Sequence, residues 1–385
     1  MLDYEEKNLK SPFERSEDYQ AKPCSKFLSV GEKWSHLLQV HSKPSEEKER
    51  LEWEEMLAEA LREPDRRKRS HLLVELQFKF SNHANKLAKK IIEEIHLAES
   101  EKTVKPAPMA GVMGQKFFAD NIVFKMVSVD ALGMFAEELE VPLKCSGREM
   151  LALKAVMKLH LEGKSDIRVP LACKVDWMGH RVLALSHLPV NCQSLVLGQN
   201  CGRFVKKANE RVKEEVRKTA ALLNLKESRT NQGSCHFPVD SEIHFHSQNI
   251  FALGLTRLFP SFLSRSQCGP SEHLKHLYAQ FRPEFLQIYQ HPLSVDSCGA
   301  FSDLPTEEER KNAYNFLTED VIPKFAVSLS SIGGFIGGKR LTRLIHKKGI
   351  NVCFLGKVSR SIFLFSCLKS FNFFWKRSSR LWTKS

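Results

Sequence analysis

The segment from Cys235 to Pro260 gathers residue types that often carry chemistry. A polar cluster is followed by the short apolar run Ile250–Leu255 and by the charged exit Thr256-Arg257; the cluster comprises His236, Asp240, Glu242, His244 and His246. In proteins that mix helices and strands, residues that contact a ligand often lie in a polar loop before a short buried strand or at a charged residue directly after it. We therefore expect these histidines and carboxylates on a loop or at the surface, because they are too polar for the core.

Metal binding and covalent catalysis are the first chemistries to weigh. His244 and His246 on a strand would point to one face, but no fourth ligand follows at a spacing typical of zinc sites. The chain also lacks the Gly-x-Ser-x-Gly nucleophile elbow, the phosphate-binding P-loop and the His-Glu-x-x-His motif. We therefore expect no metal, no cofactor and no catalytic residue, so the sequence does not predict an enzyme.

A second set of residues follows the order of the small lobe of a protein kinase. A glycine-rich turn at residues 111–114 precedes Lys125 on a predicted strand and Glu149 on a predicted helix. In kinases this lysine holds the α- and β-phosphates and this glutamate orients the lysine. Lys125 and Glu149 are therefore candidate nucleotide-binding residues. The alternative is a solvated lysine and a surface glutamate without a ligand.

Two later residues complete that candidate nucleotide site. Asp240 and Asn249 precede the apolar strand in the order of a kinase catalytic loop, and Gly254 stands where a kinase has its metal-binding aspartate. Without that carboxylate, Mg²⁺ would lose a charged oxygen ligand. Even in a kinase-like fold, we therefore expect no phosphoryl transfer.

The basic charge of the chain is concentrated near its end. Of 58 Lys and Arg and 45 Asp and Glu, residues 321–385 hold 13 basic residues and no acidic one, which leaves 45 of each in residues 1–320. Basic and aromatic residues alternate in the tail, and this composition suits single-stranded RNA or an anionic membrane surface. The apolar run Ile362–Leu368 is too short to span a bilayer. The candidate residues for RNA or an anionic surface are Lys339, Arg340, Arg343, Lys347 and Lys348.

Hydrophobic periodicity predicts two helices in the N-terminal quarter. Apolar residues recur at helical spacing from Trp53 to Leu61, and a second helix passes through Leu87–Ile95 with Ser81 or Asn82 as its N-cap. The prolines in Glu101–Pro108 indicate a linker after these helices.

The middle of the chain alternates strands and helices. Strands are predicted at Ile122–Val127, Val169–Val175 and Arg181–Leu185, the last two joined by a hairpin turn at Met178-Gly179. Helices are predicted at Arg148–His160 and Phe204–Leu225, and mainly helices beyond Pro260. The fold class is α+β: a helical leader at 1–104, a β-rich lobe at 105–200, a larger helix-rich lobe at 201–356 and a basic aromatic tail at 357–385.

Five segments in this order resemble the Clu (clustered mitochondria) family. They are KPAPMAGVMGQKFFADNIVFK, GREMLAL, VPLACKVDWMGHRVLALSHLP, the Cys235–Pro260 segment and GINVCFLG, and together they span roughly residues 80–356. The family pattern has Asp, His and Arg where this chain has Gly254, Arg148 and Cys353. The family's tetratricopeptide region has no counterpart in the chain, which puts binding of partners through helical repeats in doubt.

The resemblance implies a function in mitochondrial organisation. Members of the family are large cytosolic proteins linked to mitochondrial distribution and to messenger RNAs for mitochondrial proteins, and some are associated with eukaryotic initiation factor three. It therefore implies a cytoplasmic, non-enzymatic protein whose partners are RNA or ribosome-associated factors. The alternatives are a degenerate kinase-like nucleotide-binding module and a peripheral binder of anionic membrane surfaces. Scattered cysteines without a Cys-x-x-Cys pair suit the reducing cytosol.

Overall fold

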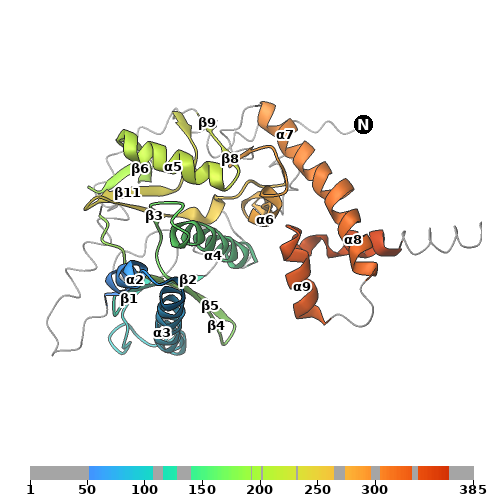
Figure 1. Cartoon of the computed structure of the whole chain (residues 1–385). Helices are drawn as coiled ribbons and strands as arrows, with labels where there is room; N and C mark the ends of the chain where they lie inside the picture. Colours follow the sequence, from blue (N-terminus) through green and yellow to red (C-terminus); the bar gives the residue numbers. More distant parts are fainter. Residues whose placement is uncertain are drawn as a thin grey trace, which may run out of the picture.

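The computed structural model describes residues 52–106, 116–127, 140–191, 193–200, 203–230, 233–263, 274–295, 304–331 and 337–363. Within these residues the fold is α+β, as the sequence predicts. Two β-sheets lie on either side of helix α4 (Glu140–Leu161), and further helices cover their outer faces (Figure 1). The glycine-rich turn at residues 111–114 and the tail beyond residue 363 lie outside the described residues.

Helices α2 (Trp53–Arg62) and α3 (Arg66–Glu93) form a hairpin against the first sheet. The rings of Trp53 and Phe80 meet edge to face, with centroids 5.1 Å apart. The predicted N-cap at Ser81 or Asn82 is wrong, because α3 begins at Arg66, where the Asp65 side chain accepts a hydrogen bond from Lys68 N at 2.8 Å. The buried face of α3 continues through those two polar residues: Leu76, Phe80, Ala84, Ala88 and Ile92.

Residues 101–106, the described part of the predicted linker at 101–108, pack against the fold. Val104 is buried, the Thr103 hydroxyl donates to Glu94 at 2.6 Å, and Pro106 forms a bridge with Phe117. Residues 52–104 consequently share one hydrophobic core with the first sheet.

The first sheet is antiparallel, in the order β1-β2-β5-β4. Its strands are β1 (Lys116–Ala119), β2 (Ile122–Val127), β4 (Ala172–Trp177) and β5 (His180–Ser186). The predicted hairpin is confirmed: Val175 pairs with Val182 around Met178 and Gly179, which both have positive φ. Strand β4 begins later than predicted, because Pro170 cannot donate a backbone hydrogen bond and Leu171 N bonds the Ser186 hydroxyl instead.

The second sheet has the order β3-β12-β11-β6-β7. Its strands are β3 (Ile167–Arg168), β6 (Leu195–Asn200), β7 (Arg203–Lys206), β11 (Glu242–His246) and β12 (Asn249–Leu253). Only β3 and β12 run parallel. Two small sheets, β9 (Ser228–Thr230) with β10 (Gly233–Cys235) and β8 (Leu225–Lys226) with β13 (Leu293–Ser294), lie beside it.

Two helices of the middle region differ from their predicted bounds. The predicted helix Phe204–Leu225 divides into strand β7 and helix α5 (Glu210–Leu222), because the Asn209 side chain caps the helix by accepting from Val212 N. Helix α4 extends eight residues before Arg148. Pro142 is compatible with this start, since the first turn of a helix does not use its N–H groups.

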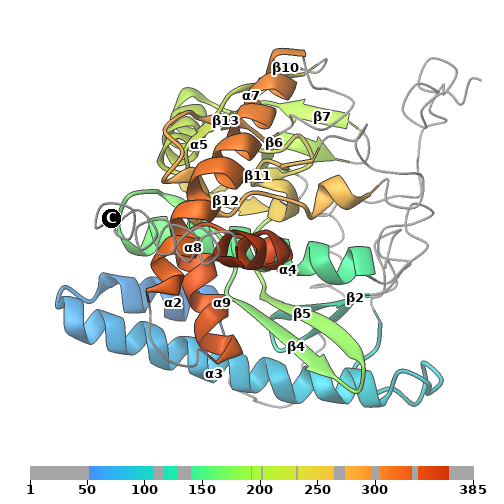
Figure 2. The ribbon, with the colours of Figure 1, turned by 90° about the vertical axis from the view of Figure 1, so that its right-hand side faces the viewer.

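The C-terminal part is mainly helical, as predicted. It comprises η3 (Leu255–Arg257), η6 (Lys275–Leu277), α6 (Pro283–Leu286), α7 (Leu304–Asn315), η7 (Phe316–Val321), α8 (Ile322–Ser330), α9 (Gly338–Lys347), η8 (Val352–Phe354) and a helix at 355–363. Helices α7 and α8 are joined by the π-helical turn η7 into one long rod (Figure 2). Among the described residues, each helix is too short or too polar to cross a lipid bilayer.

Helix α4 lies between two hydrophobic cores. One core fills the space between α2, α3 and the first sheet, and the other joins α4, α5, the second sheet and the C-terminal helices. Met157 of α4 packs against both. Contacts of α4 therefore connect the two hydrophobic cores.

Candidate functional site around helix α4

The structure brings two of the candidate nucleotide-binding residues together. Lys125 Nζ on β2 donates to Glu149 Oε1 on α4 at 2.9 Å. Lys125 is the only residue of β2 that is not buried. The Lys125 side chain is 29% exposed and the Glu149 side chain is 12% exposed. The pair therefore joins the first sheet to α4 at a partly accessible position.

The other two candidates lie apart from each other. Asn249 begins β12 beside the Ser247-Gln248 turn, whereas Asp240 precedes β11 at the opposite end of the same hairpin. The length of a five-residue strand, roughly 13 Å, separates these ends. Arg257 Nε and Nη2 bind both carboxylate oxygens of Asp240 at 2.9 and 2.8 Å. The four candidates thus do not form one cluster, and nucleotide binding by any of them stays a prediction.

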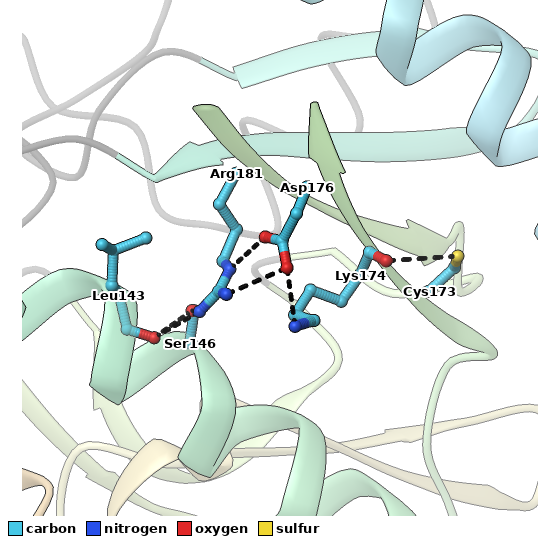
Figure 3. Close-up of polar contacts among 6 residues, drawn as sticks. All are labelled: Leu143, Ser146, Cys173, Lys174, Asp176 and Arg181. Carbon is cyan, nitrogen blue, oxygen red and sulfur yellow. Dashed lines mark hydrogen bonds and ion pairs between the residues drawn. The ribbon is translucent and has the colours of Figure 1, made fainter. Parts of the chain in front are cut away.

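An aspartate–arginine pair attaches the β4–β5 hairpin to the first turns of α4 (Figure 3). Arg181 donates to both carboxylate oxygens of Asp176 at 2.5 and 3.0 Å, and its Nη1 donates to Leu143 O on α4 at 2.9 Å. Lys174 Nζ donates to the same carboxylate at 2.8 Å. The hydrogen bonds from Arg181 hold the pKa of Asp176 at about 2, below its ordinary 3.8. Asp176, Gly179 and Arg181 match the Asp-Tyr-x-Gly-x-Arg pattern of the Clu resemblance: Gly179 forms the turn of the hairpin, and Asp176 holds the Arg181 side chain that bonds α4.

We expect the Asp176→Asn variant to lose less of its free energy of unfolding than the wild type when the pH is lowered. Because the folded-state pKa is depressed, the carboxylate contributes stability above pH 3.8 that is lost as the pH falls toward about 2. The Asp176 side chain is 49% exposed, so solvent screening reduces the contribution to about 1 kcal/mol. Urea unfolding at several pH values measures it. Identical losses of stability in wild type and variant between about pH 4 and pH 2 would contradict this role.

A second arginine connects α4 to the GINVCFLG segment. Arg148 Nε donates to Tyr278 O at 2.7 Å, and Arg148 Nη1 lies 3.5 Å from Asn351 Oδ1. Asn351 Nδ2 in turn donates to Gln280 O at 2.7 Å. Burial lowers the pKa of Arg148 to about 10, so it remains charged at neutral pH. Two distant segments of the Clu resemblance are thereby joined within the described structure.

The expected loop or surface position is wrong for His244 of the polar cluster, whereas Asp240 is exposed and precedes strand β11. His244 lies on β11 and is buried, with Nδ1 3.0 Å from the Ser194 hydroxyl and Nε2 3.4 Å from Glu242 Oε2. These partners satisfy both ring nitrogens, which is why a histidine is tolerated there. Within the described residues, no three His, Cys, Asp or Glu side chains are grouped as metal ligands would be.

The candidate RNA-binding residues lie on one exposed face of α9 and its C-cap. This α9 basic face comprises Lys339, Arg340, Arg343, Lys347 and Lys348, all exposed. The opposite side of the helix carries Ile345, which is buried, with Leu341 and Leu344 packed against the larger core. No described carboxylate forms an ion pair with the α9 basic face.

A run of four basic residues was not predicted as a candidate site. Arg66, Arg67, Lys68 and Arg69 occupy the first turn of α3, far from α9 (Figure 1). Residues 1–320 have no net charge, so their total charge gives no sign of this run. A count of charges in short windows along the sequence identifies it.

A protein-family comparison assigns the chain. The family model named Clustered mitochondria (CLU) matches residues 52–262, from the start of α2 to just beyond η3. The match covers more than half of the chain and includes α3, α4, both large sheets and the Asp176–Arg181 pair. Comparisons with curated proteins and with solved structures find no match. The family description points to a role in the organisation of mitochondria, and the chain belongs to the clustered mitochondria family.

Proposed function

We propose that this protein is a non-enzymatic RNA-binding protein of the cytoplasm that acts in mitochondrial organisation. The α9 basic face carries the proposal. It supplies phosphate contacts, and its charge is not neutralised by ion pairs with described residues. The RNA would be messenger RNA or RNA of the translation machinery.

The geometry of α9 suits a nucleic-acid backbone. Lys339, Arg343 and Lys347 are spaced four residues apart and form a stripe whose Cα atoms are about 6 Å apart along the axis. Because Ile345 and its apolar neighbours fix the other side of the helix to the core, the basic side chains face solvent from a rigid support. The long, flexible lysine and arginine side chains can then follow a single strand without reading its sequence.

Two features support a non-enzymatic role. Gly254, in the kinase position of the metal-binding aspartate, has φ +68° and offers no carboxylate to Mg²⁺. The nearby carboxylate of Asp240 is bound on both oxygens by Arg257. Neither of these two positions therefore offers an available carboxylate for the metal of a phosphoryl-transfer site.

Titration of a labelled single-stranded RNA with the full chain tests the proposal. We expect Arg343→Glu/Lys347→Glu to weaken binding by about tenfold or more, because two contacts become repulsive. The matched control is Lys154→Glu/Lys158→Glu, which reverses two exposed charges four residues apart on α4. Equal affinity of wild type and the α9 variant would refute the assignment of α9. Equal weakening by the control would show a non-specific charge effect.

The Lys125–Glu149 ion pair favours a second candidate function, a nucleotide-binding module without catalysis. Because Lys125 is held by Glu149 and remains partly exposed, it could contact a phosphate as the kinase lysine does. If this module binds ATP, the nucleotide should raise the melting temperature of the wild type but not of Lys125→Met, which keeps the apolar stem. No Mg²⁺-dependent phosphoryl transfer should accompany the shift. An equal shift in both proteins would exclude this lysine as the ligand.

A further inference from the structure

The N-terminal half of α3 presents a basic and apolar surface to solvent. We define the α3 outer face by Arg66, Arg67, Lys68, Leu72, Val74 and Phe78. Val74 and Phe78 are 68% and 67% exposed, although they belong to a helix whose opposite side is buried. None of the three basic residues forms an ion pair with a residue that the structure describes.

The periodicity of α3 places charge and apolar surface side by side. Arg67, Val74 and Phe78 are separated by seven and four residues and lie on one stripe, while Lys68 and Leu72 form a second stripe beside it. Leu76 and Phe80 point the other way, into the core shared with α2. The exposed apolar side chains are therefore not a continuation of the core.

The position of the basic residues is unfavourable for the isolated helix. The first turn of α3 contains no acidic residue, and the positive end of the helix dipole repels cations placed there. From Asp65 to Phe80 the two carboxylates are the N-cap Asp65 and Glu75, which lies 3.9 Å from His71, against five Lys and Arg residues. An anionic partner would offset this accumulated positive charge.

We propose that the α3 outer face binds an anionic phospholipid surface. Exposed aliphatic side chains beside basic ones are the pattern of a helix that lies in a membrane interface. The bases of RNA would instead need several aromatic faces for stacking, and the apolar part of the α3 outer face has two aliphatic side chains, Leu72 and Val74, beside one ring, Phe78.

The shape of this region agrees with a flat partner. Helix α3 runs along the edge of the molecule, and its N-terminal end reaches past strands β4 and β5 (Figure 2). A projecting helix can lie on a bilayer, where the apolar side chains enter the headgroup boundary and the basic ones meet lipid phosphates and carboxylates. This surface is separate from α9 and does not depend on RNA binding.

Co-sedimentation of the full chain with vesicles tests the proposal. We expect binding to vesicles of phosphatidylcholine with phosphatidylserine and little binding to phosphatidylcholine alone. Each basic side chain near such a surface changes affinity by about fivefold, so Arg66→Glu/Arg67→Glu/Lys68→Glu should lower it by roughly a hundredfold or more. Val74→Gln/Phe78→Gln should also weaken binding while preserving the charge.

Two controls separate lost binding from lost folding. Lys68→Glu places a carboxylate at the third helical position, where it forms a capping box with Asp65, so the charge variant should melt at or above the wild-type temperature. The α9 variant Arg343→Glu/Lys347→Glu should bind vesicles as the wild type does. The proposal is overturned if wild type fails to bind anionic vesicles or binds both compositions equally. It is also overturned if the α3 variants keep vesicle binding, or lose RNA binding instead.

Discussion

Gly349→Ala should destabilise the protein by about 3 kcal/mol. Gly349 has φ +73°, and a Cβ there would lie 2.4 Å from Phe285 N and 2.5 Å from Phe285 Cα. A left-handed conformation costs a non-glycine residue about 1–2 kcal/mol, and overpacking adds roughly 1–3 kcal/mol. Urea unfolding of both proteins measures the difference.

The surroundings of Gly349 leave little room for adjustment. Glycine follows the C-cap of α9, where Gly349 N bonds His346 O at 2.9 Å and Ile350 N bonds Ile345 O at 3.1 Å, the Schellman arrangement. Phe285 is fully buried, and its ring is stacked on Phe281 with centroids 4.7 Å apart. The added methyl group must therefore displace backbone rather than a flexible side chain.

Gly356→Ala is the matched control for Gly349→Ala. It alters the same GINVCFLG segment, but Gly356 lies in the helix at 355–363, where a Cβ would meet no atom within 4 Å. Alanine is favoured over glycine in a helix interior by about 1 kcal/mol, so this variant should be as stable as wild type or slightly more stable. If Gly349→Ala and Gly356→Ala unfold at the same urea concentration, the close contact of Gly349 with Phe285 of α6 is wrong.

Local sequence patterns predicted those parts of the fold that local interactions determine. Strand β2 has its predicted bounds, Ile122–Val127, and the hairpin turn lies at Met178-Gly179. Helix α2 follows the predicted periodicity from Trp53. In each case the short apolar run, the helical spacing of apolar residues or the turn chemistry indicates the conformation without help from distant residues.

Elements that depend on distant partners were predicted less well. His244 appeared too polar for the core, because its partner Ser194 is fifty residues away in the sequence. The N-cap of α3 is a different case, because the true cap is local: Asp65 accepts from Lys68 N, three residues away, and the helix continues past Ser81 and Asn82, which also suit an N-cap.

The candidate nucleotide-binding residues also differ in how far the sequence predicts their positions. The kinase-like order of residues pairs Lys125 with Glu149, and the structure places Lys125 Nζ 2.9 Å from Glu149 Oε1, while nucleotide binding by this pair stays a prediction. It gave no indication that Asp240 and Asn249 lie at opposite ends of one hairpin, because the strand pairing of β11 and β12 decides their separation. The bonds that Arg148 makes to residues more than a hundred positions away have no local signal at all.

The salt dependence of RNA binding tests the central claim, that the α9 basic face contacts RNA phosphates. Each phosphate contact contributes roughly −0.7 to the slope of log affinity against log salt concentration for a single strand. Replacing all five residues of the α9 basic face by glutamine removes their charges while retaining good helix formers. The measurement is the affinity of the full chain for one single-stranded RNA at several salt concentrations. We predict a slope flatter by roughly 0.7 for each lost contact, whereas equal slopes for wild type and variant would contradict the account.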